Sequence, residues 1–192
     1  MILGANLIKE LINRGVEVED TQGDRRICPL IEGLGDSQIN QIEGTTVDLR
    51  LGEILRLESG AELRVDSRIT PKVTPVLNQD SPQRFYSLAP DEFVLVQTME
   101  QINLPRNLLA DVHTRTTLFR CGLYLKTAYI SPNYQGVLTF GLKNLSNHQT
   151  TMELGVRIAC ISFMEIRGEA VPYHGVWQGK RASTDGQVER PF

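Results

Sequence analysis

The sequence predicts a mainly β domain, a β-barrel or jelly-roll-like fold with one N-terminal helix. Short strand-like runs recur between turn signals, only one stretch has helical spacing, and 192 residues with 41% hydrophobic content suit one compact domain. The strand-like runs lie at 46–51, 93–96, 122–125, 137–140 and 157–163. Regular short strands with little helix are typical of barrels and jelly rolls.

The predicted helix begins near Asn6 and ends at Gly15. Apolar residues at 7, 8, 11 and 12 have the spacing of one helix face. Asn6 is a plausible N-cap, and a glycine directly after Arg14 is a common stop. We expect this to be the main helix of the fold.

The remaining segments are predicted to be connections or a tail. Glycines, prolines and acidic residues in 15–44 favour loops and short edge strands. The stretch 70–83 carries three prolines, which cannot donate to a central ladder, so it is expected to be a surface excursion. Residues 168–192 are rich in glycine, serine and charge and are expected to be a mobile tail after a domain spanning 1–167.

Bulk properties exclude several classes of function. A formal net charge of −3 provides no global basic field, so we expect no long nucleic-acid partner. Cys28, Cys121 and Cys160 are far apart and form no C-x-x-C pair, so reduced thiols are expected. There is no signal-peptide pattern at the start and no apolar run of the roughly 18 residues that a membrane span requires. The chain is therefore expected to be cytoplasmic, with no membrane partner.

A possible phosphate site lies at Arg115, Thr116, Thr117 and Arg120. Two guanidinium groups flank two hydroxyls within six positions, a combination that suits a triphosphate. The alternative is that the arginines are surface charges and the threonines merely favour a strand, because short basic motifs often arise without function.

Five motifs, in the same order, resemble those of dCTP deaminases. Residues 45–52 (T-T-V-D-L-R-L-G) are similar to S-V-D-L-R-L-G, and 115–118 (R-T-T-L) to the phosphate motif R-S-S-L. Residues 130–136 (I-S-P-N-Y-Q-G) resemble I-D-P-G-F-S-G, 154–159 (L-G-V-R-I-A) resemble P-G-M-K-I-G, and 173–179 (Y-H-G-V-W-Q-G) resemble the closing Y-x-G-x-Y-Q-G. The chain is identified as a member of the dCTP deaminase and trimeric dUTPase superfamily.

This resemblance implies a distorted jelly-roll of the dUTPase type that forms a homotrimer with active sites at the subunit interfaces. It implies dCTP or dUTP as the ligand, with Mg²⁺ bound through the triphosphate and no zinc. Zinc-dependent deaminases need an H-x-E and P-C-x-x-C set, which His113, His148 and His174 do not complete.

The resemblance also assigns roles to individual residues. It places phosphates on Arg115, Thr116, Thr117 and Arg120, with the tail 168–192 closing over the nucleotide. The alternative for Tyr134 is an ordinary turn aromatic, and packing against a neighbouring subunit is favoured for Trp177. The residues implied in nucleoside binding are Ala128, Ile130, Tyr134, Tyr173, Gln178 and Lys180.

Both carboxylates that do chemistry in the superfamily are replaced. Ser131 stands where dUTPases have an aspartate, and Gly141 stands where dCTP deaminases have a glutamate, so Thr116 is left with a supporting role at most. Acid–base catalysis typically contributes about 10²–10⁴-fold, so turnover should be weak or absent while binding persists. An alternative is that Asp111 or Glu153 serves instead.

Three hypotheses follow. The chain is an enzyme that deaminates dCTP or releases pyrophosphate from dUTP, or a silent homologue that senses a nucleotide or regulates a partner, or a structural trimer that has lost binding. The spacing from Gly122 to Ile130 is that of a dUTPase, whereas both chain ends resemble deaminases, so the base preference stays open.

Overall fold

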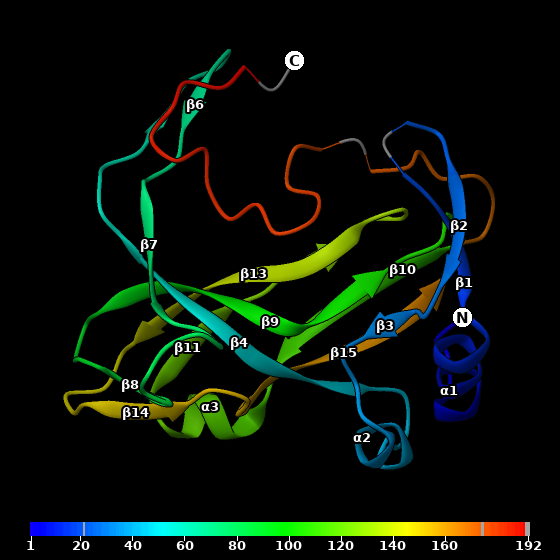
Figure 1. The fold of residues 1–192 in the computed structure, drawn as a ribbon, viewed down its shortest axis with the longest axis horizontal. Coiled ribbons are helices and arrows are strands. Elements are labelled where there is room, and N and C mark those ends of the chain that lie inside the picture. Colours follow the sequence, from blue (N-terminus) through cyan, green and yellow to red (C-terminus); the bar gives the residue numbers. More distant parts are fainter. Residues whose placement is uncertain (21, 174, 191–192) are drawn as a thin grey trace.

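The structure is a computed structural model that describes residues 1–20, 22–173 and 175–190. Its main element is a curled antiparallel sheet of nine strands (Figure 1). The strands are β3 (Ile31–Glu32), β4 (Val47–Leu57), β7 (Val73–Leu77), β9 (Phe93–Asn103), β10 (Leu108–Thr114), β11 (Leu123–Lys126), β12 (Tyr129–Ile130), β13 (Gln135–Asn144) and β15 (Arg157–Glu165). Their order is β11-β13-β9-β4-β15-β10-β12, with β3 also pairing with β9 and β7 with β4.

Three two-stranded ribbons and three helices surround this sheet in the described part of the chain. The ribbons pair β1 (Val16–Glu19) with β2 (Arg25–Cys28), β5 (Glu62–Leu63) with β6 (Arg68–Ile69), and β8 (Phe85–Leu88) with β14 (Thr150–Glu153). The helices are α1 (Ala5–Arg14), α2 (Asp36–Asn40) and α3 (Thr116–Arg120). The predicted mainly β fold with an N-terminal helix is confirmed, and α2 and α3 add one short turn each.

The core forms because alternate strand residues point inward. In β4 the side chains of Val47, Leu49 and Leu51 are buried, and the largest fully buried side chain is that of Phe163 on β15. The helix α1 buries Ile8, Leu11 and Ile12 against this core. Its N-cap is Gly4 rather than Asn6, so the predicted side-chain cap is wrong by two residues.

A buried ion pair joins two central strands. Glu100 on β9 is fully buried, and it accepts hydrogen bonds from the backbone N (2.8 Å) and Nε (2.6 Å) of Arg50 on β4. Arg50 also donates from Nη2 to the carbonyl of Gly33 at 2.6 Å. Because each group is satisfied, the pair fixes the position of β4 against β9.

Two segments expected to be irregular are more ordered than predicted. Part of the stretch 70–83 forms β7, which pairs with β4 even though it contains Pro75. A proline is tolerated there because, among the described strands, β7 pairs on one edge only and the register shifts beside Leu55. The tail is not free in the structure, because its backbone pairs with Gln135 through Gly179 (2.8 Å) and with Thr70 through Gly186 (3.1 Å). Figure 1 shows the tail crossing between β13 and the excursion that carries β6 and β7.

Among the described residues, no helix has both the length and the apolar character to cross a membrane.

Candidate functional site

A cavity of about 470 Å³ lies between the β12–β13 hairpin, one face of the sheet and the tail. Most of its wall is apolar, and the described residues that line it include no carboxylate and no histidine. One cation, Arg181, is among these described residues. The lining residues are Leu57, Thr70, Pro71, Leu95, Ala128, Tyr129, Ile130, Ser131, Tyr134, Leu138, Thr139, Phe140, Tyr173, Trp177, Arg181, Ala182 and Ser183.

Five of the predicted site residues meet in this cavity. They come from the turn and hairpin around β12 and from the start of the tail, which are far apart in sequence, and they are Ala128, Ile130, Ser131, Tyr134 and Tyr173. The rings of Tyr134 and Tyr173 contact edge-on, with centroids 5.8 Å apart. The structure therefore brings the predicted hairpin residues and part of the tail together.

Tyr134 is a fixed, neutral wall of the cavity. Its hydroxyl donates to the carbonyl of Val137 at 2.6 Å. Burial, with a smaller contribution from Tyr173, raises the pKa of the Tyr134 phenol to about 12. A neutral ring held at both ends can pack against an apolar or sugar face, but it cannot act as a base near pH 7.

Gly136 lets the tail approach the sheet. It has φ +143°, and a β-carbon there would lie 2.2 Å from the carbonyl oxygen of Gly179. The neighbouring Gln178 fixes the register, because its side-chain oxygen accepts from Gln135 N (2.8 Å) and its amide donates to Asn133 O (3.0 Å). Gln178, predicted to bind nucleoside, is thus committed to backbone groups and does not line the cavity.

Lys180 also lies away from this cavity. It lines a separate polar hollow, and its carbonyl accepts a hydrogen bond from Gln97 Nε2 at 3.0 Å. The same Gln97 amide donates to Thr139, which does line the cavity. The tail backbone at Lys180, rather than its ammonium, is therefore tied to the wall of the cavity.

The position of Gly141 is covered by a ring that sequence reasoning did not identify. Thr139 and Gly141 lie two residues apart on the same face of β13. A β-carbon at Gly141 would lie 2.9 Å from two atoms of the Phe93 ring on β9. Any side chain at 141 therefore requires the Phe93 ring to move.

The two alternative carboxylates also lie elsewhere. Asp111 on β10 contacts the Nε2 atom of His113 at 2.9 Å, and Glu153 is the exposed last residue of β14. Neither of them lines the cavity.

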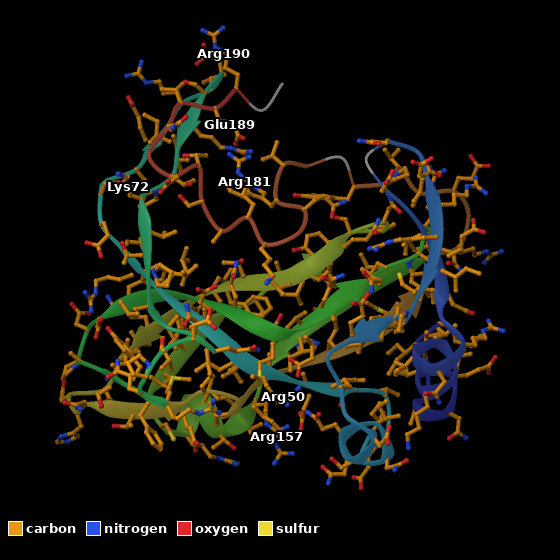
Figure 2. The ribbon with its side chains drawn as sticks, in the orientation of Figure 1. Arg50, Lys72, Arg157, Arg181, Glu189 and Arg190 are labelled. Carbon is orange, nitrogen blue, oxygen red and sulfur yellow. The ribbon has the colours of Figure 1, made fainter. Side chains whose placement is uncertain are left out.

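The predicted phosphate residues are on a different part of the chain surface. Arg115 forms an ion pair with Asp48, which also contacts Arg157 at 3.0 Å, in a polar hollow beside β4 and β15. Figure 2 shows Arg157 below the sheet and Arg181 above it. Within one chain, the Arg115 group and the tyrosine-lined cavity are therefore separate.

Arg120 does not join Arg115 in one receptor. Its guanidinium carbon lies 5.9 Å from the ring centroid of Phe119 at the exposed end of α3. Thr116 and Thr117 are exposed on the first turn of the same helix. Arg115 lines the polar hollow beside β4 and β15, and Arg120 is not among the described residues that line it.

The tail carries a cluster of charges that the sequence analysis did not identify. Glu189 bridges Arg68 on β6 (2.8 Å) and Arg181 (2.6 Å), and both guanidiniums lie against the ring of Trp177. The residues are up to 121 positions apart, so no local spacing signals them. Trp177 therefore packs within its own chain in the structure.

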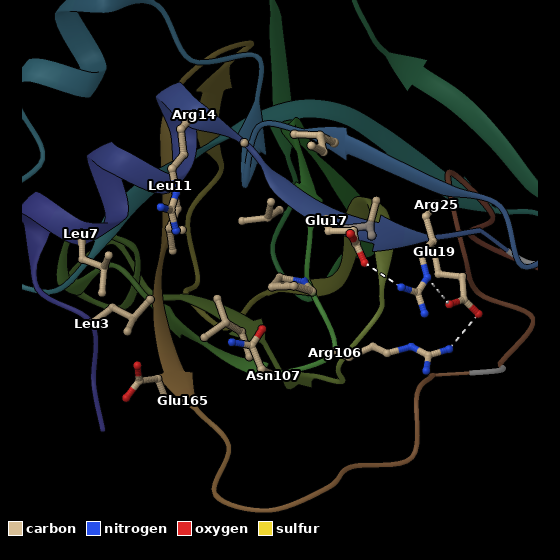
Figure 3. A pocket seen from close by; sticks show the side chains of 16 residues that line it. Leu3, Leu7, Leu11, Arg14, Glu17, Glu19, Arg25, Arg106, Asn107 and Glu165 are labelled. Atoms are coloured by element: carbon tan, nitrogen blue, oxygen red, sulfur yellow. Dashed lines mark hydrogen bonds and ion pairs between the residues drawn. The ribbon is translucent and has the colours of Figure 1, made fainter.

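A larger cavity of about 600 Å³ lies between α1 and the β1–β2 hairpin (Figure 3). Its floor is leucine and valine. Arg25 pairs with Glu17 (3.2 Å) and Glu19 (3.5 Å), and Arg106 pairs with Glu19 (2.7 Å) at the rim. Arg25, Arg106, Glu17 and Glu19 are therefore paired with one another at this rim.

Comparison with known proteins identifies the family. A dCTP deaminase-like family model matches residues 3–166, so the chain belongs to that family. The chain is 32% identical over 152 residues to "dCTP deaminase, dUMP-forming" from Sulfurihydrogenibium sp., covering 77% of this chain and 83% of the relative. It is also 32% identical over 126 residues to "dCTP deaminase" from Thermococcus kodakarensis, covering 64% of this chain and 79% of that protein.

A solved structure supports the fold. The crystal structure of 2'-deoxycytidine 5'-triphosphate deaminase from Agrobacterium tumefaciens aligns with a TM-score of 0.58 at 16% identity. The match covers 84% of this chain and 47% of that one, so this chain spans about half the length of that protein. At this identity the likeness concerns the fold alone.

Proposed function

We propose that the chain binds a pyrimidine deoxynucleoside triphosphate in the tyrosine-lined cavity and turns it over weakly or not at all. The observation that carries this proposal is the cavity itself, which has aromatic and apolar walls for a nucleoside but no carboxylate among the described residues that line it. Family membership supports nucleotide metabolism as the context.

The sugar and base are proposed to lie against Tyr134 and Tyr173, beside Ala128 and Ile130 of the hairpin. Such mostly apolar pockets with few polar groups are typical of small-ligand sites. Ser131 also lines the cavity, but a hydroxyl of high pKa is a poor general base.

The phosphates are proposed to reach Arg115, Thr116, Thr117 and Arg120 of a neighbouring chain in a homotrimer. This arrangement follows from the family resemblance, and the separation of α3 from the cavity within one chain supports it. Mg²⁺ is proposed to bind through the triphosphate. The described lining residues supply no carboxylate, so the phosphate oxygens and water would have to supply the ligands of such an ion.

Loss of the acid–base group is proposed to limit chemistry. At Gly141 there is no side chain to move a proton, and the Phe93 ring fills the space that such a side chain would need. A missing acid–base group typically costs about 10²–10⁴-fold in rate. The regulatory alternative, a nucleotide sensor or assembly partner, is favoured by the same observation.

The experiment measures binding and turnover separately. Calorimetry with dCTP and dUTP plus Mg²⁺ should detect binding, while product analysis at high protein concentration should detect little deamination or pyrophosphate release. The variant pair Phe93→Ala and Phe93→Ala/Gly141→Glu tests the cause, since only the second restores a carboxylate. We expect deamination to rise in the double variant alone.

An active deaminase is the second candidate, because the relative that is 32% identical over 77% of the chain carries that name. Rapid turnover of dCTP by the unmodified chain, abolished by Arg115→Gln, would establish it and reject the weak-turnover proposal. Failure of every nucleotide to bind would instead favour the structural trimer.

A further inference from the structure

The tail contains an internal anion next to the proposed nucleotide cavity. Glu189 is held by its backbone as well as its side chain, because its N–H and C=O pair with the C=O and N–H of Arg68 at 2.9 Å each. Its carboxylate is largely buried, with 16% of the side chain exposed. The position of this charge is therefore fixed by the β5–β6 ribbon.

Two guanidiniums share that carboxylate. Arg68 donates from Nε to Oε2 at 2.8 Å, and Arg181 donates from Nη1 to Oε1 at 2.6 Å. Their Cζ atoms lie 4.7 Å and 5.3 Å from the centroid of the Trp177 ring. Figure 2 shows Arg181 and Glu189 close together above the sheet.

Arg181 belongs to two environments at once. It pairs with Glu189, and it also lines the cavity whose other walls are Tyr134, Tyr173 and Trp177. Phosphate and carboxylate oxygens are alternative partners for a guanidinium fork. Among the described residues that line the cavity from its own chain, Arg181 is the cation within reach of a phosphate, and that phosphate must compete with Glu189 for it.

The competition concerns Arg181 alone. Glu189 remains bound to Arg68 through two backbone hydrogen bonds and the hydrogen bond from Arg68 Nε. Glu189 can therefore stay in place when the Arg181 side chain rotates away. Arg181 has 37% of its side chain exposed, which leaves room for that rotation.

We propose that the Glu189 carboxylate competes with nucleotide phosphate for the guanidinium of Arg181. A bound phosphate then replaces Glu189 as the partner of Arg181. The proposal rests on the proposed function for its ligand, but the anion exchange can be measured without a nucleoside. Glu189 then lowers the affinity for the charged ligand and makes binding move the tail.

Trp177 reports the exchange directly, because it is the single tryptophan in the sequence and it contacts Arg181. Tripolyphosphate, dCTP and deoxycytidine are titrated into the full chain while Trp177 emission is followed. Glu189→Gln removes the competing charge, Arg181→Gln removes the shared cation, and Glu169→Gln is the control for losing an exposed tail carboxylate.

Because more than a third of the Arg181 side chain is exposed, its ion pair with Glu189 is of modest strength, so Glu189→Gln should tighten binding of tripolyphosphate and dCTP by about two- to fivefold. Deoxycytidine should bind equally well to both proteins, Glu169→Gln should match the unmodified chain, and Arg181→Gln should weaken both anions. Equal anion affinities in Glu189→Gln and Glu169→Gln would overturn the proposal. If tripolyphosphate behaves as expected while dCTP and deoxycytidine do not bind, the anion exchange stands and the proposed nucleotide function falls.

Discussion

Replacing Gly136 with alanine should release the tail from the sheet. The β-carbon of alanine would lie 2.2 Å from Gly179 O, about 1 Å closer than a carbon and an oxygen approach even in short contacts. Because Gly136 is on β13 and contacts the tail backbone, the tail is the element that can yield.

The size of the effect follows from two terms. Overpacking typically costs about 1–3 kcal/mol, and losing the hydrogen bond from Gly179 N to Gln135 O adds about 1 kcal/mol. Together these weaken tail docking by about 2–4 kcal/mol, which raises the population of released tail by about 30- to 700-fold. The positive φ of Gly136 adds strain of about 1–3 kcal/mol to the whole fold.

Hydrogen exchange of the tail amides, with tryptic cleavage after Lys180 and Arg181, measures this release. Gly168→Ala is the matched control, because Gly168 has φ +93° but a β-carbon there meets no atom within 4 Å. It should carry the backbone strain without releasing the tail. Equal protection of the tail in Gly136→Ala and Gly168→Ala would refute the reasoning.

Three further predictions concern stability and pH. Removing the fully buried carboxylate with Glu100→Ala should lower the free energy of unfolding by about 3 kcal/mol, because the guanidinium of Arg50 is left unpaired. Urea denaturation measures this loss, and a loss below about 1 kcal/mol would contradict the prediction. Burial opposes ionisation of Glu189, but hydrogen bonds and charges of Arg181 and Arg68 lower the pKa of its carboxyl overall. The stabilisation by this ion pair is present above the unfolded-state pKa of Glu189 and is lost as pH falls through the lower folded-state pKa. The tail amides should therefore lose protection from hydrogen exchange below about pH 4.5. Unchanged protection at pH 3 would count against the ion pair. The pKa of Tyr134 is raised to about 12, so the folded chain should lose stability from about pH 10 upward, because the phenol ionises first in the unfolded chain. Tyr134→Phe should remove that part of the loss. An unaltered dependence of stability on pH above pH 10 in this variant would argue against the prediction.

The sequence alone determined the fold class and singled out several residues that line one cavity in the structure. Strand positions could be predicted because side chains alternate in burial along strands such as β4 and β15, and turn residues mark where those strands end. Tyr134 and Tyr173 were found because they lie in motifs with fixed spacing, and both line one cavity in the structure. Family membership, predicted from five ordered motifs, is confirmed by the match to residues 3–166.

Tertiary structure decided the features that depend on contacts between distant segments. The pairing of Glu189 with Arg68, the Phe93 ring over Gly141 and the separation of Arg115 from the tyrosine-lined cavity have no signature in local spacing. Periodicity reports which face of an element is buried, but it does not report which distant element covers that face. For this protein, the sequence therefore determined which residues lie close together within a motif, because their spacing is local. The fold decided which charged group and which aromatic ring lie beside them, because those come from distant segments.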